Sequence, residues 1–549
     1  MTYPLPLEQL ATNVAAHPNK PYLHQPRDGQ WHTLTWGEVE EQARRIAAGL
    51  KAQGFEPGDR IAILAKNSAE WFITDFAIMM AGLISVPIYA TAGASTIQHI
   101  MRHSNAKAIF VGKLDDLRAA EQALEPETLI ITFPYPTLKG HAEFNQWLQD
   151  FPPLTNVHQP QPDDTVTLVY TSGSTGLPKG VVLSYLNVAA SSYCTAHIQP
   201  RGDNERSMSY LPLAHITERC VLELMTLYHP LEIFFVESLE SFIEDVRHAQ
   251  PTYFISVPRL WTKFQGQVLA KIPDPKLQRL LKIPVIGKLV ARKIRNQLGL
   301  GQATLFGSGS APISPSTLAW YARLGIRISE GWGMTETAGL ACGNNPFEAS
   351  RLGTIGVPVA CVEMKLSADE EILIRGDAIF KEYYRNPEAT AAAFSGDWFH
   401  TGDRARQNTD GSWSITGRVK EQFKTAKGKY VAPVPLESLL SQNPDIEQIC
   451  VLGSGRKQPL AVVVLNETHQ QPSEEIRQRL QATLTKVNAE LESHQRLDNI
   501  IISTEPWGID NELLTPTLKL RRNKLEARFG NLLWATLPKP VMWEQEIQT

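Results

Sequence analysis

The alternation of helical and β-rich stretches is the feature of this sequence that most restricts its fold. Up to about residue 420, helical stretches such as 36–54 alternate with short β-rich runs such as 60–64, 108–111 and 128–132. Strands separated by helices commonly pair in parallel, with the helices covering the faces of the sheet. We therefore expect an α/β fold with a large N-terminal domain of stacked β-sheets and helices.

The predicted secondary structure changes between residues 353 and 420. Short strands and tight turns prevail there, including the strand-like EILIRG and the Asp410-Gly411 pair, which is typical of a hairpin. This pattern predicts a β-rich subdomain at the end of the large domain.

A shorter αβ pattern follows, with strands near 449–452 and 460–465 and a helix over 473–491. That is enough for a separate small domain. We predict an N-terminal domain over 1–419 and a small, mobile α+β domain over 420–549, with the hinge at Lys420.

Composition excludes several classes of protein. The net charge of −4 gives no reason to expect nucleic-acid binding. The five cysteines are scattered without CxxC spacing, which argues against a disulfide framework or a zinc site and suits a reducing cytoplasm. The most apolar stretch, 71–90, is interrupted by Asp75 and Pro87 and predicts a buried helix followed by a strand. We expect neither a signal peptide nor a transmembrane segment.

The stretch YTSGSTGLPKG, residues 170–180, combines glycines, hydroxyl groups and Lys179 directly after a strand-like run. Glycines let backbone N–H groups approach an anion, hydroxyls donate hydrogen bonds to it, and the lysine supplies positive charge, so the loop suits phosphate. It is not a Walker A loop, because Pro178 stands where the second glycine is required and Gly180 follows the lysine.

This stretch resembles the phosphate-loop signature of the adenylate-forming (AMP-binding) superfamily, which includes acyl-CoA synthetases, firefly-type luciferases and peptide-synthetase adenylation domains. Further motifs in the same order strengthen the resemblance: LPLAHITER (211–219), GSGSAPIS (307–314), EGWGMTET (330–337), TGD (401–403), GRVKEQFK (417–424) and TPTLKLRR (515–522). Together they span most of the chain. The usual glycine before the lysine of the last motif is Leu518 here, a departure that also occurs in long-chain members.

The resemblance implies that an acid and ATP form acyl-AMP and pyrophosphate, with Mg²⁺, and that a thiol then takes the acyl group. It implies that Thr335 contacts the α-phosphate, that Glu336 binds Mg²⁺, and that Lys519 stabilises charge at the reacting centre. The residues implied to hold the triphosphate are Thr171, Ser172, Gly173, Ser174, Thr175, Gly176 and Lys179.

The other site residues are implied in the same way. Trp332 would stack on the adenine, while Asp403 and Arg418 would hold the ribose hydroxyls. Gly428 would approach coenzyme A after the small domain rotates about Lys420. The remaining nucleotide contacts would be Ser310, Ala311, Gly331 and Gly333, and the acyl site would include His215, Gly309 and Gly333.

LPLAHITER and VPRLW (257–261) look most like the long-chain fatty acyl-CoA synthetases, so we expect a medium- to long-chain fatty acid and coenzyme A as substrates. Two alternatives stay open: an acyl-AMP ligase that loads a carrier protein, and a non-catalytic nucleotide or acyl-AMP sensor. The presence of Lys179, Glu336 and Lys519 argues against the sensor.

The segment 259–295 carries ten Lys or Arg residues against one acid, Asp274. Apolar Ile286, Leu289, Val290 and Ile294 recur there at helical spacing, as in an amphipathic helix on anionic lipid. We expect either peripheral membrane contact through this segment or a solvated basic face above a core-packed helix.

Overall fold

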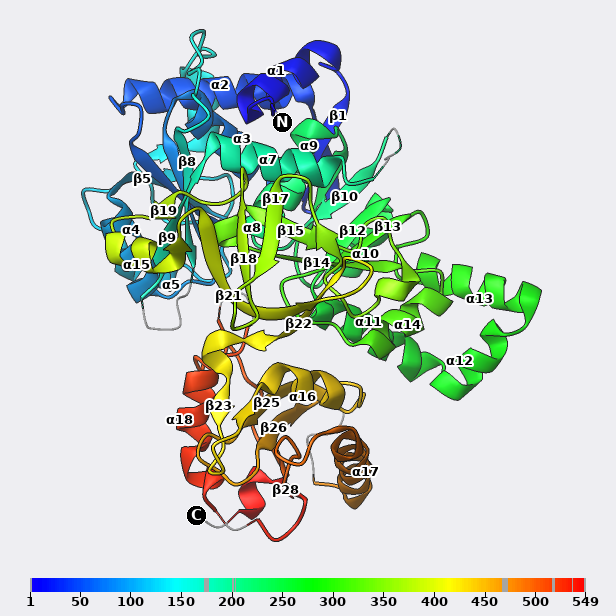
Figure 1. Ribbon diagram of the computed structural model, residues 1–549. Coiled ribbons are helices and arrows are strands. Elements are labelled where there is room, and N and C mark those ends of the chain that lie inside the picture. Colours follow the sequence, from blue (N-terminus) through cyan, green and yellow to red (C-terminus); the bar gives the residue numbers. More distant parts are fainter. Residues whose placement is uncertain are drawn as a thin grey trace.

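The computed structural model describes residues 2–171, 177–199, 202, 204–466, 472–515, 519–535 and 537–547. Figure 1 shows a large upper body, which contains the elements from α1 to β22, and a smaller lower body, which contains those from β23 to the C-terminus. The two are joined below the hairpin of β21 (Trp398–Gln407) and β22 (Trp413–Arg418). The predicted α/β class, with a large N-terminal part and a small C-terminal part, is confirmed.

The largest sheet has the order β19-β9-β8-β4-β3-β5-β6-β7, and its strands from β8 to β7 run parallel, as predicted. The prediction fails at the other edge, where β9 pairs antiparallel with both β8 and β19, because only a short stretch without a helix separates β8 from β9 in the sequence. The bounds are β3 (Arg60–Ala65), β4 (Ile84–Ile88), β5 (Ala106–Gly112), β6 (Leu129–Thr132), β7 (Ala142–Glu143), β8 (Thr165–Thr171), β9 (Lys179–Ser184) and β19 (Glu382–Tyr383).

Two further sheets complete the core of the upper body, with orders β10-β11-β1-β2 and β12-β13-β14-β15-β16. The first consists of β1 (Pro21–Arg27), β2 (Gln30–Thr35), β10 (Arg206–Ser209) and β11 (Glu232–Phe235). The second consists of β12 (Tyr253–Ser256), β13 (Leu305–Ser308), β14 (Ile328–Met334), β15 (Gly339–Gly343) and β16 (Val357–Pro358).

The helices that pack on these sheets include the predicted buried one, α3 (Ala69–Met80), which leads into β4. In the part of the chain that the structure describes, none of the helices has the length and hydrophobicity needed to cross a membrane. The others are α1 (Pro6–Ala16), α2 (Trp36–Ala52), α4 (Ala94–Ser104), α5 (Arg118–Ala123), α6 (Phe144–Asp150), α7 (Tyr185–Ala196), α8 (Ile216–Glu218), a π-helical turn (Arg219–Glu223), α9 (Met225–Tyr228), α10 (Phe242–Ala249), α14 (Pro315–Arg323) and α15 (Pro387–Ala393).

The predicted β-rich subdomain is an antiparallel sheet in which EILIRG forms β18 (Glu371–Gly376). The Asp410-Gly411 pair lies in the turn between β21 and β22, and Gly411 has φ 81°, the left-handed conformation that suits glycine there. The remaining strands are β17 (Val362–Leu366) and β20 (Phe394–Ser395).

The lower body is built on the sheet β25-β26-β27-β28. Its helix α17 (Glu474–Glu490) and strand β26 (Leu460–Leu465) match the predicted 473–491 and 460–465 closely. The other elements are β23 (Phe423–Lys424), β24 (Tyr430–Val431), β25 (Ile446–Leu452), β27 (Ile500–Ile502), β28 (Val541–Trp543), α16 (Pro433–Leu440) and α18 (Arg522–Leu533).

The basic segment forms three helices, α11 (Pro258–Lys271), α12 (Asp274–Leu281) and α13 (Pro284–Gln297). The grouping of Ile286, Leu289, Val290 and Ile294 into one lipid-facing set is wrong. Ile294 is buried and Val290 packs against the same core, whereas Ile286 and Leu289 are exposed. The helix therefore presents two different apolar faces.

Candidate functional site

The two described ends of the phosphate-loop motif lie on the paired strands β8 and β9. Thr171 ends β8, Lys179 begins β9, and the two residues are direct partners across the antiparallel pair. The predicted contacts Ser172, Gly173, Ser174, Thr175 and Gly176 lie outside the described residues.

A tyrosine joins the lysine of this motif to the predicted metal ligand. The ammonium Nζ of Lys179 lies 5.1 Å from the ring centroid of Tyr383, whose phenol donates a 2.9 Å hydrogen bond to Oε1 of Glu336. The geometry follows from the sheet, because β19 pairs with β9 and sets Tyr383 opposite Val181. Cation–π contact and a hydrogen bond thus hold the three side chains together.

Glu336 is buried in a 3₁₀ turn with Thr335. Burial raises the pKa of its carboxyl group, and the nearby Lys519 and Arg418 oppose that effect. No Lys or Arg forms an ion pair with Glu336 among the residues that the structure describes. A buried carboxylate that forms no ion pair with a protein cation is suited to bind a divalent cation.

Glycines set the spacing between the GSGSAPIS and EGWGMTET motifs. A Cβ on Gly309 would lie 3.1 Å from the carbonyl oxygen of Gly331, and one on Gly333 would lie 1.7 Å from that of Gly339. The β13–β14 pairing brings these backbones together, and a side chain at Gly333 would force β15 away.

The predicted base-stacking and ribose residues are directly linked. Trp332 donates from Nε1 to Oδ2 of Asp403 at 2.9 Å, and Nε of Arg418 lies 2.9 Å from Oδ1 of the same carboxylate. Asp403 and Arg418 are partners across β21 and β22, and the carboxylate raises the pKa of the guanidinium. The pair is therefore charged and held in one orientation.

Lys519, from the far end of the chain, reaches the same place. Its charge interacts with those of Arg418, Asp403 and Glu336. The side chain keeps contact with solvent, yet the protein atoms around it and the Arg418 cation lower the pKa of its ammonium. The structure thus brings a cation of the lower body to a group of charged residues in the upper body.

His215 lies beside Lys519. Its burial, together with the Lys519 charge, lowers the pKa of the imidazole to about 3, so the ring is neutral at physiological pH. The following Thr217 places its Oγ1 3.5 Å from Oγ of Ser310, which has a φ of 66°. This contact sets the LPLAHITER motif against the loop that carries Ser310 and the exposed Ala311.

Two predicted residues lie apart from this group. Lys420 is exposed in a short 3₁₀ turn that follows β22. Gly428, with φ 77°, is exposed in the turn between β23 and β24, where no described atom lies within 4 Å of an ideal Cβ position. In this arrangement Lys519, and not Gly428, faces the charged group.

A metal held by the protein alone finds no support in the described part of the chain, where no group of three or more His, Cys, Asp or Glu side chains could bind one. Glu336 would be a single protein ligand. This fits Mg²⁺, which usually keeps water and substrate phosphate oxygens as its other ligands.

The sequence motifs did not indicate Tyr383 or the structural roles of Glu218 and Arg219 in LPLAHITER. Arg219 is fully buried, with its Nη2 2.6 Å from Oδ1 of Asp75, and Glu218 accepts hydrogen bonds from Ser209 and from the Tyr210 backbone. Two adjacent, oppositely charged residues in an otherwise apolar motif were a signal for a buried polar network. Tyr383 carried no such local signal.

Family models match nearly the whole chain. The model described as AMP-binding enzyme matches residues 10–384, and the model described as AMP-binding enzyme C-terminal domain matches residues 420–533.

Curated relatives are similar over most of their length. The chain is 31% identical to fatty acyl-CoA synthetase A of Dictyostelium discoideum, over 92% of this chain and 86% of the relative. It is 29% identical to the long-chain-fatty-acid–CoA ligase FadD15 of Mycobacterium bovis, over 92% of each.

Solved structures share the fold at lower identity. An anthranilate CoA ligase bound to anthranoyl-AMP aligns with a TM-score of 0.81 and 23% identity, over 96% of this chain and 98% of the other. The o-succinylbenzoate CoA synthetase of Bacillus subtilis aligns with a TM-score of 0.74 and 20% identity, over 96% and 99%.

Proposed function

This chain belongs to the AMP-binding enzyme family, and from that premise we propose that it is an AMP-forming fatty acid–CoA ligase. It converts a medium- to long-chain fatty acid and ATP to acyl-AMP and pyrophosphate, and then transfers the acyl group to coenzyme A, releasing AMP. One observation carries the proposal: Lys519 lies within electrostatic reach of Glu336, Asp403 and Arg418. A protein that only bound a nucleotide would have no need of a cation at the reacting centre.

In the first step, a carboxylate oxygen of the acid bonds to the α-phosphorus of ATP, and the bond from that phosphorus to the pyrophosphate oxygen breaks. Both reactants are anions, so bringing them together requires positive charge. Lys179 is assigned to the triphosphate, Thr335 to the α-phosphate, and Lys519 to the charge that develops between carboxylate and phosphorus. Thr171 and residues 172–176 of the motif are assigned to the other phosphate contacts.

Glu336 is assigned to Mg²⁺, which when bound neutralises phosphate charge and orients the leaving pyrophosphate. The support is a buried carboxylate that accepts a hydrogen bond from Tyr383 and forms no ion pair with a described Lys or Arg. Tyr383 keeps that carboxylate in place, with or without the ion.

The nucleoside is assigned to the linked side chains. Trp332 covers the adenine between Gly331, Gly333 and the loop of Ser310 and Ala311, while Asp403 and Arg418 bind the ribose hydroxyls. The 2.9 Å contacts of Asp403 with Trp332 and Arg418 preorganise these groups.

In the second step, the thiol of coenzyme A attacks the acyl carbon and AMP leaves. We assign residues 1–419 and 420–549 to two domains, with Lys420 as the hinge that removes Lys519 from the reacting centre and brings Gly428 toward it. Lys420 occupies an exposed turn between β22 and β23, where a change of backbone angle meets little resistance.

The preference for a fatty acid rests on the names of the relatives and on the character of the acyl site. A neutral His215 and the small residues Gly309 and Gly333 offer no charge to hold a second polar group of the substrate. An enzyme for such substrates would act in the cytoplasm, with peripheral membrane contact through residues 259–295.

Acid-dependent exchange of radiolabelled pyrophosphate into ATP tests the proposal, with a panel from acetate to oleate, aryl acids and amino acids. Exchange with long chains that is lost in Lys519→Ala, and AMP release on adding coenzyme A, would support it. Exchange without CoA turnover would indicate loading of a carrier protein. The absence of exchange with every acid would indicate a sensor.

A further inference from the structure

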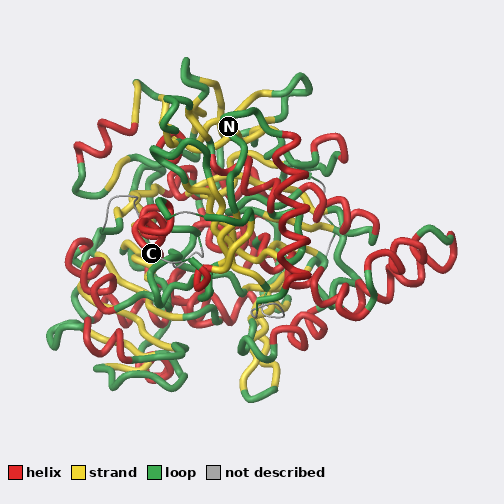
Figure 2. The backbone as a smooth tube through the Cα atoms, turned by 90° about the horizontal axis from the view of Figure 1, so that it is seen from below, coloured by secondary structure: helices red, strands yellow, loops and turns green. Residues whose placement is uncertain are grey.

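The turn between α12 and α13 and the first two turns of α13 carry exposed apolar side chains at the end of a helical projection. Figures 1 and 2 both show these helices extending away from the body of the molecule. Val285 is 70% exposed and Leu289 60%, and the neighbouring Ile283 and Ile286 are exposed as well. Four large apolar residues within seven positions form a group that water solvates poorly.

These four exposed residues do not contribute to the hydrophobic core. The inner face of α13 is already provided by buried Gly287 and Ile294, with Val290 packed beside them and Leu298 buried directly after the helix. Gly287 lies so close to α12 that a Cβ would be 2.4 Å from the carbonyl oxygen of Leu281. The corner is therefore tightly fixed, and the outer apolar group cannot turn inward.

Cations surround the apolar group. Six exposed Lys or Arg side chains lie on α12, on α13 and in the turn between them, and none of them forms an ion pair with a described residue: Lys276, Arg279, Lys282, Lys288, Arg292 and Lys293. No acidic residue occurs between positions 275 and 297. Cations gathered on one face attract an anionic partner.

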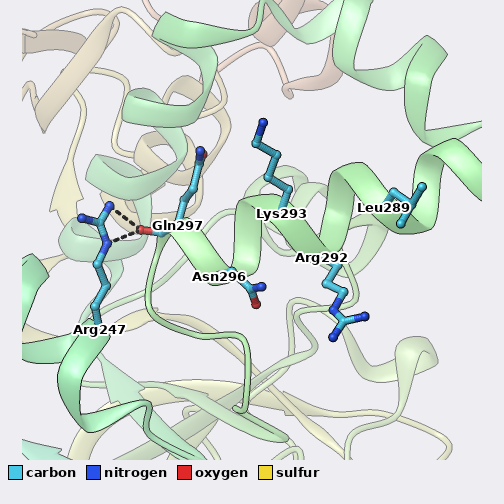
Figure 3. A pocket seen from close by; sticks show the side chains of 6 residues that line it. All are labelled: Arg247, Leu289, Arg292, Lys293, Asn296 and Gln297. Carbon is cyan, nitrogen blue, oxygen red and sulfur yellow. Dashed lines mark hydrogen bonds between the residues drawn. The ribbon is translucent and has the colours of Figure 1, made fainter.

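The positive surface continues along α13. An open pocket of about 460 Å³ there is lined by Arg247, Arg292, Lys293, Leu289, Asn296 and Gln297, without a carboxylate. Figure 3 shows Arg292 and Lys293 projecting from α13 in different directions between Leu289 and Gln297. Arg247 donates two hydrogen bonds, of 2.9 and 3.0 Å, to the carbonyl oxygen of Gln297 and is thereby fixed beside them.

The basic segment is not uniform, because its first part is engaged elsewhere. Arg259 on α11 pairs with Glu447 of β25 at 2.7 Å, so that end of the segment faces the lower body. The exposed cations of α12 and α13 lie beyond this contact and form no ion pair with a described residue.

We infer that the α12–α13 tip, defined as residues 276–293, docks on the surface of an anionic phospholipid bilayer. Ile283, Val285, Ile286 and Leu289 enter the boundary between headgroups and acyl chains, while the six cations meet lipid phosphates. This assignment sharpens the membrane contact proposed above and uses no residue assigned to catalysis.

Sedimentation of the full-length protein with vesicles tests the inference, comparing phosphatidylcholine alone with a mixture containing phosphatidylglycerol. We expect binding to the anionic vesicles. Lys288→Gln/Arg292→Gln/Lys293→Gln should weaken it about a hundredfold, at about fivefold per cation. Ile286→Ser/Leu289→Ser should weaken it at least about tenfold, because less apolar surface enters the lipid.

The matched control for charge is Lys139→Gln/Lys457→Gln/Lys486→Gln, which removes three exposed lysines elsewhere. The control for apolar surface is Leu239→Ser, which changes an exposed leucine outside the tip. Both should bind like the wild type. If the wild type did not sediment with the anionic vesicles, or if the controls lost as much binding as the tip variants, the inference would be overturned.

Pyrophosphate exchange measured without vesicles separates this inference from the proposed function. All tip variants should retain wild-type exchange, because their substitutions are solvent-exposed and outside the candidate site. Vesicle binding does not require exchange, so a protein that bound vesicles without exchanging pyrophosphate would contradict the proposed function alone.

Discussion

The phenol of Tyr383 donates a 2.9 Å hydrogen bond to the carboxylate of Glu336. The ring of the same tyrosine lies beneath the ammonium of Lys179. One side chain therefore supports both the residue assigned to Mg²⁺ and the residue assigned to the triphosphate. Burial and the Glu336 charge raise the pKa of the phenol, so it remains a hydrogen-bond donor.

Tyr383→Phe should raise the Mg²⁺ concentration needed for half-maximal adenylation about tenfold. It removes the hydrogen bond that fixes Glu336, worth about 1.5 kcal/mol for a charged acceptor, but keeps the ring beneath Lys179. Tyr383→Leu removes the ring as well and should also raise the KM for ATP. Pyrophosphate exchange over a Mg²⁺ series measures both effects.

Tyr384→Phe is the matched control, because Tyr384 is adjacent, and its phenol forms no hydrogen bond with Glu336. Equal Mg²⁺ requirements in the wild type and Tyr383→Phe would contradict a positioning role for the Tyr383 hydroxyl.

Lys519→Ala should slow adenylation about 10²- to 10³-fold, because it removes the cation assigned to the developing charge. Transfer from synthetic acyl-AMP to coenzyme A should remain within about threefold of the wild type, since Lys519 is assigned to the first step only. Rapid-quench assays of the two half-reactions measure the difference. Lys524→Ala, a lysine of the same body paired with Glu512 at 2.9 Å, is the control. Equal losses of rate in both steps would contradict the assignment of Lys519 to adenylation alone.

Much of the fold was predictable because its signals are local. The 2.0- and 3.6-residue periods predicted β26 and α17 almost to the residue. The Asp410-Gly411 pair marked a turn because glycine tolerates φ 81° there. Such features depend on a few consecutive residues.

The features that the sequence did not predict depend on contacts between residues far apart in the chain. Tyr383 reaches Glu336 only because β19 pairs with β9. The two apolar faces of α13 have the same local pattern, and only the packing around Ile294 reveals which face is covered. The motifs predicted which side chains meet, whereas contacts made by residues outside a motif required the structure.

Glu218 gives the protein a stability that falls with rising pH. Burial raises the pKa of its carboxyl to about 8 in the folded state, well above the ordinary value near 4.5. Between those two values the unfolded chain has released its proton while the folded chain retains it, so stability falls as pH rises from about 4.5 to 8.

Glu218→Gln should remove this component, since the amide oxygen can still accept from Ser209 and the Tyr210 backbone. The variant should match the wild type in thermal stability at pH 4.5 and exceed it at pH 8. Thermal unfolding at both values measures the effect. A variant less stable than the wild type at pH 8 would show that the ionised carboxylate is favoured in the folded protein.

The ion pair between Arg259 and Glu447 connects the two bodies at 2.7 Å in the arrangement that brings Lys519 to the candidate site. Breaking it with Arg259→Glu should shift the protein away from this arrangement and slow adenylation. The pair is partly exposed, so its contribution is at most about 1 kcal/mol, or about fivefold in rate.

The double variant Arg259→Glu/Glu447→Arg should restore the rate, because it recreates the pair with exchanged charges. Arg375→Glu, which breaks an exposed pair with Glu363 inside the β-rich subdomain, controls for the loss of a salt bridge as such. Adenylation assayed at low and high salt supplies the decisive comparison: a defect of Arg259→Glu that neither salt nor the charge exchange altered would mean that Arg259 acts through packing and not through Glu447.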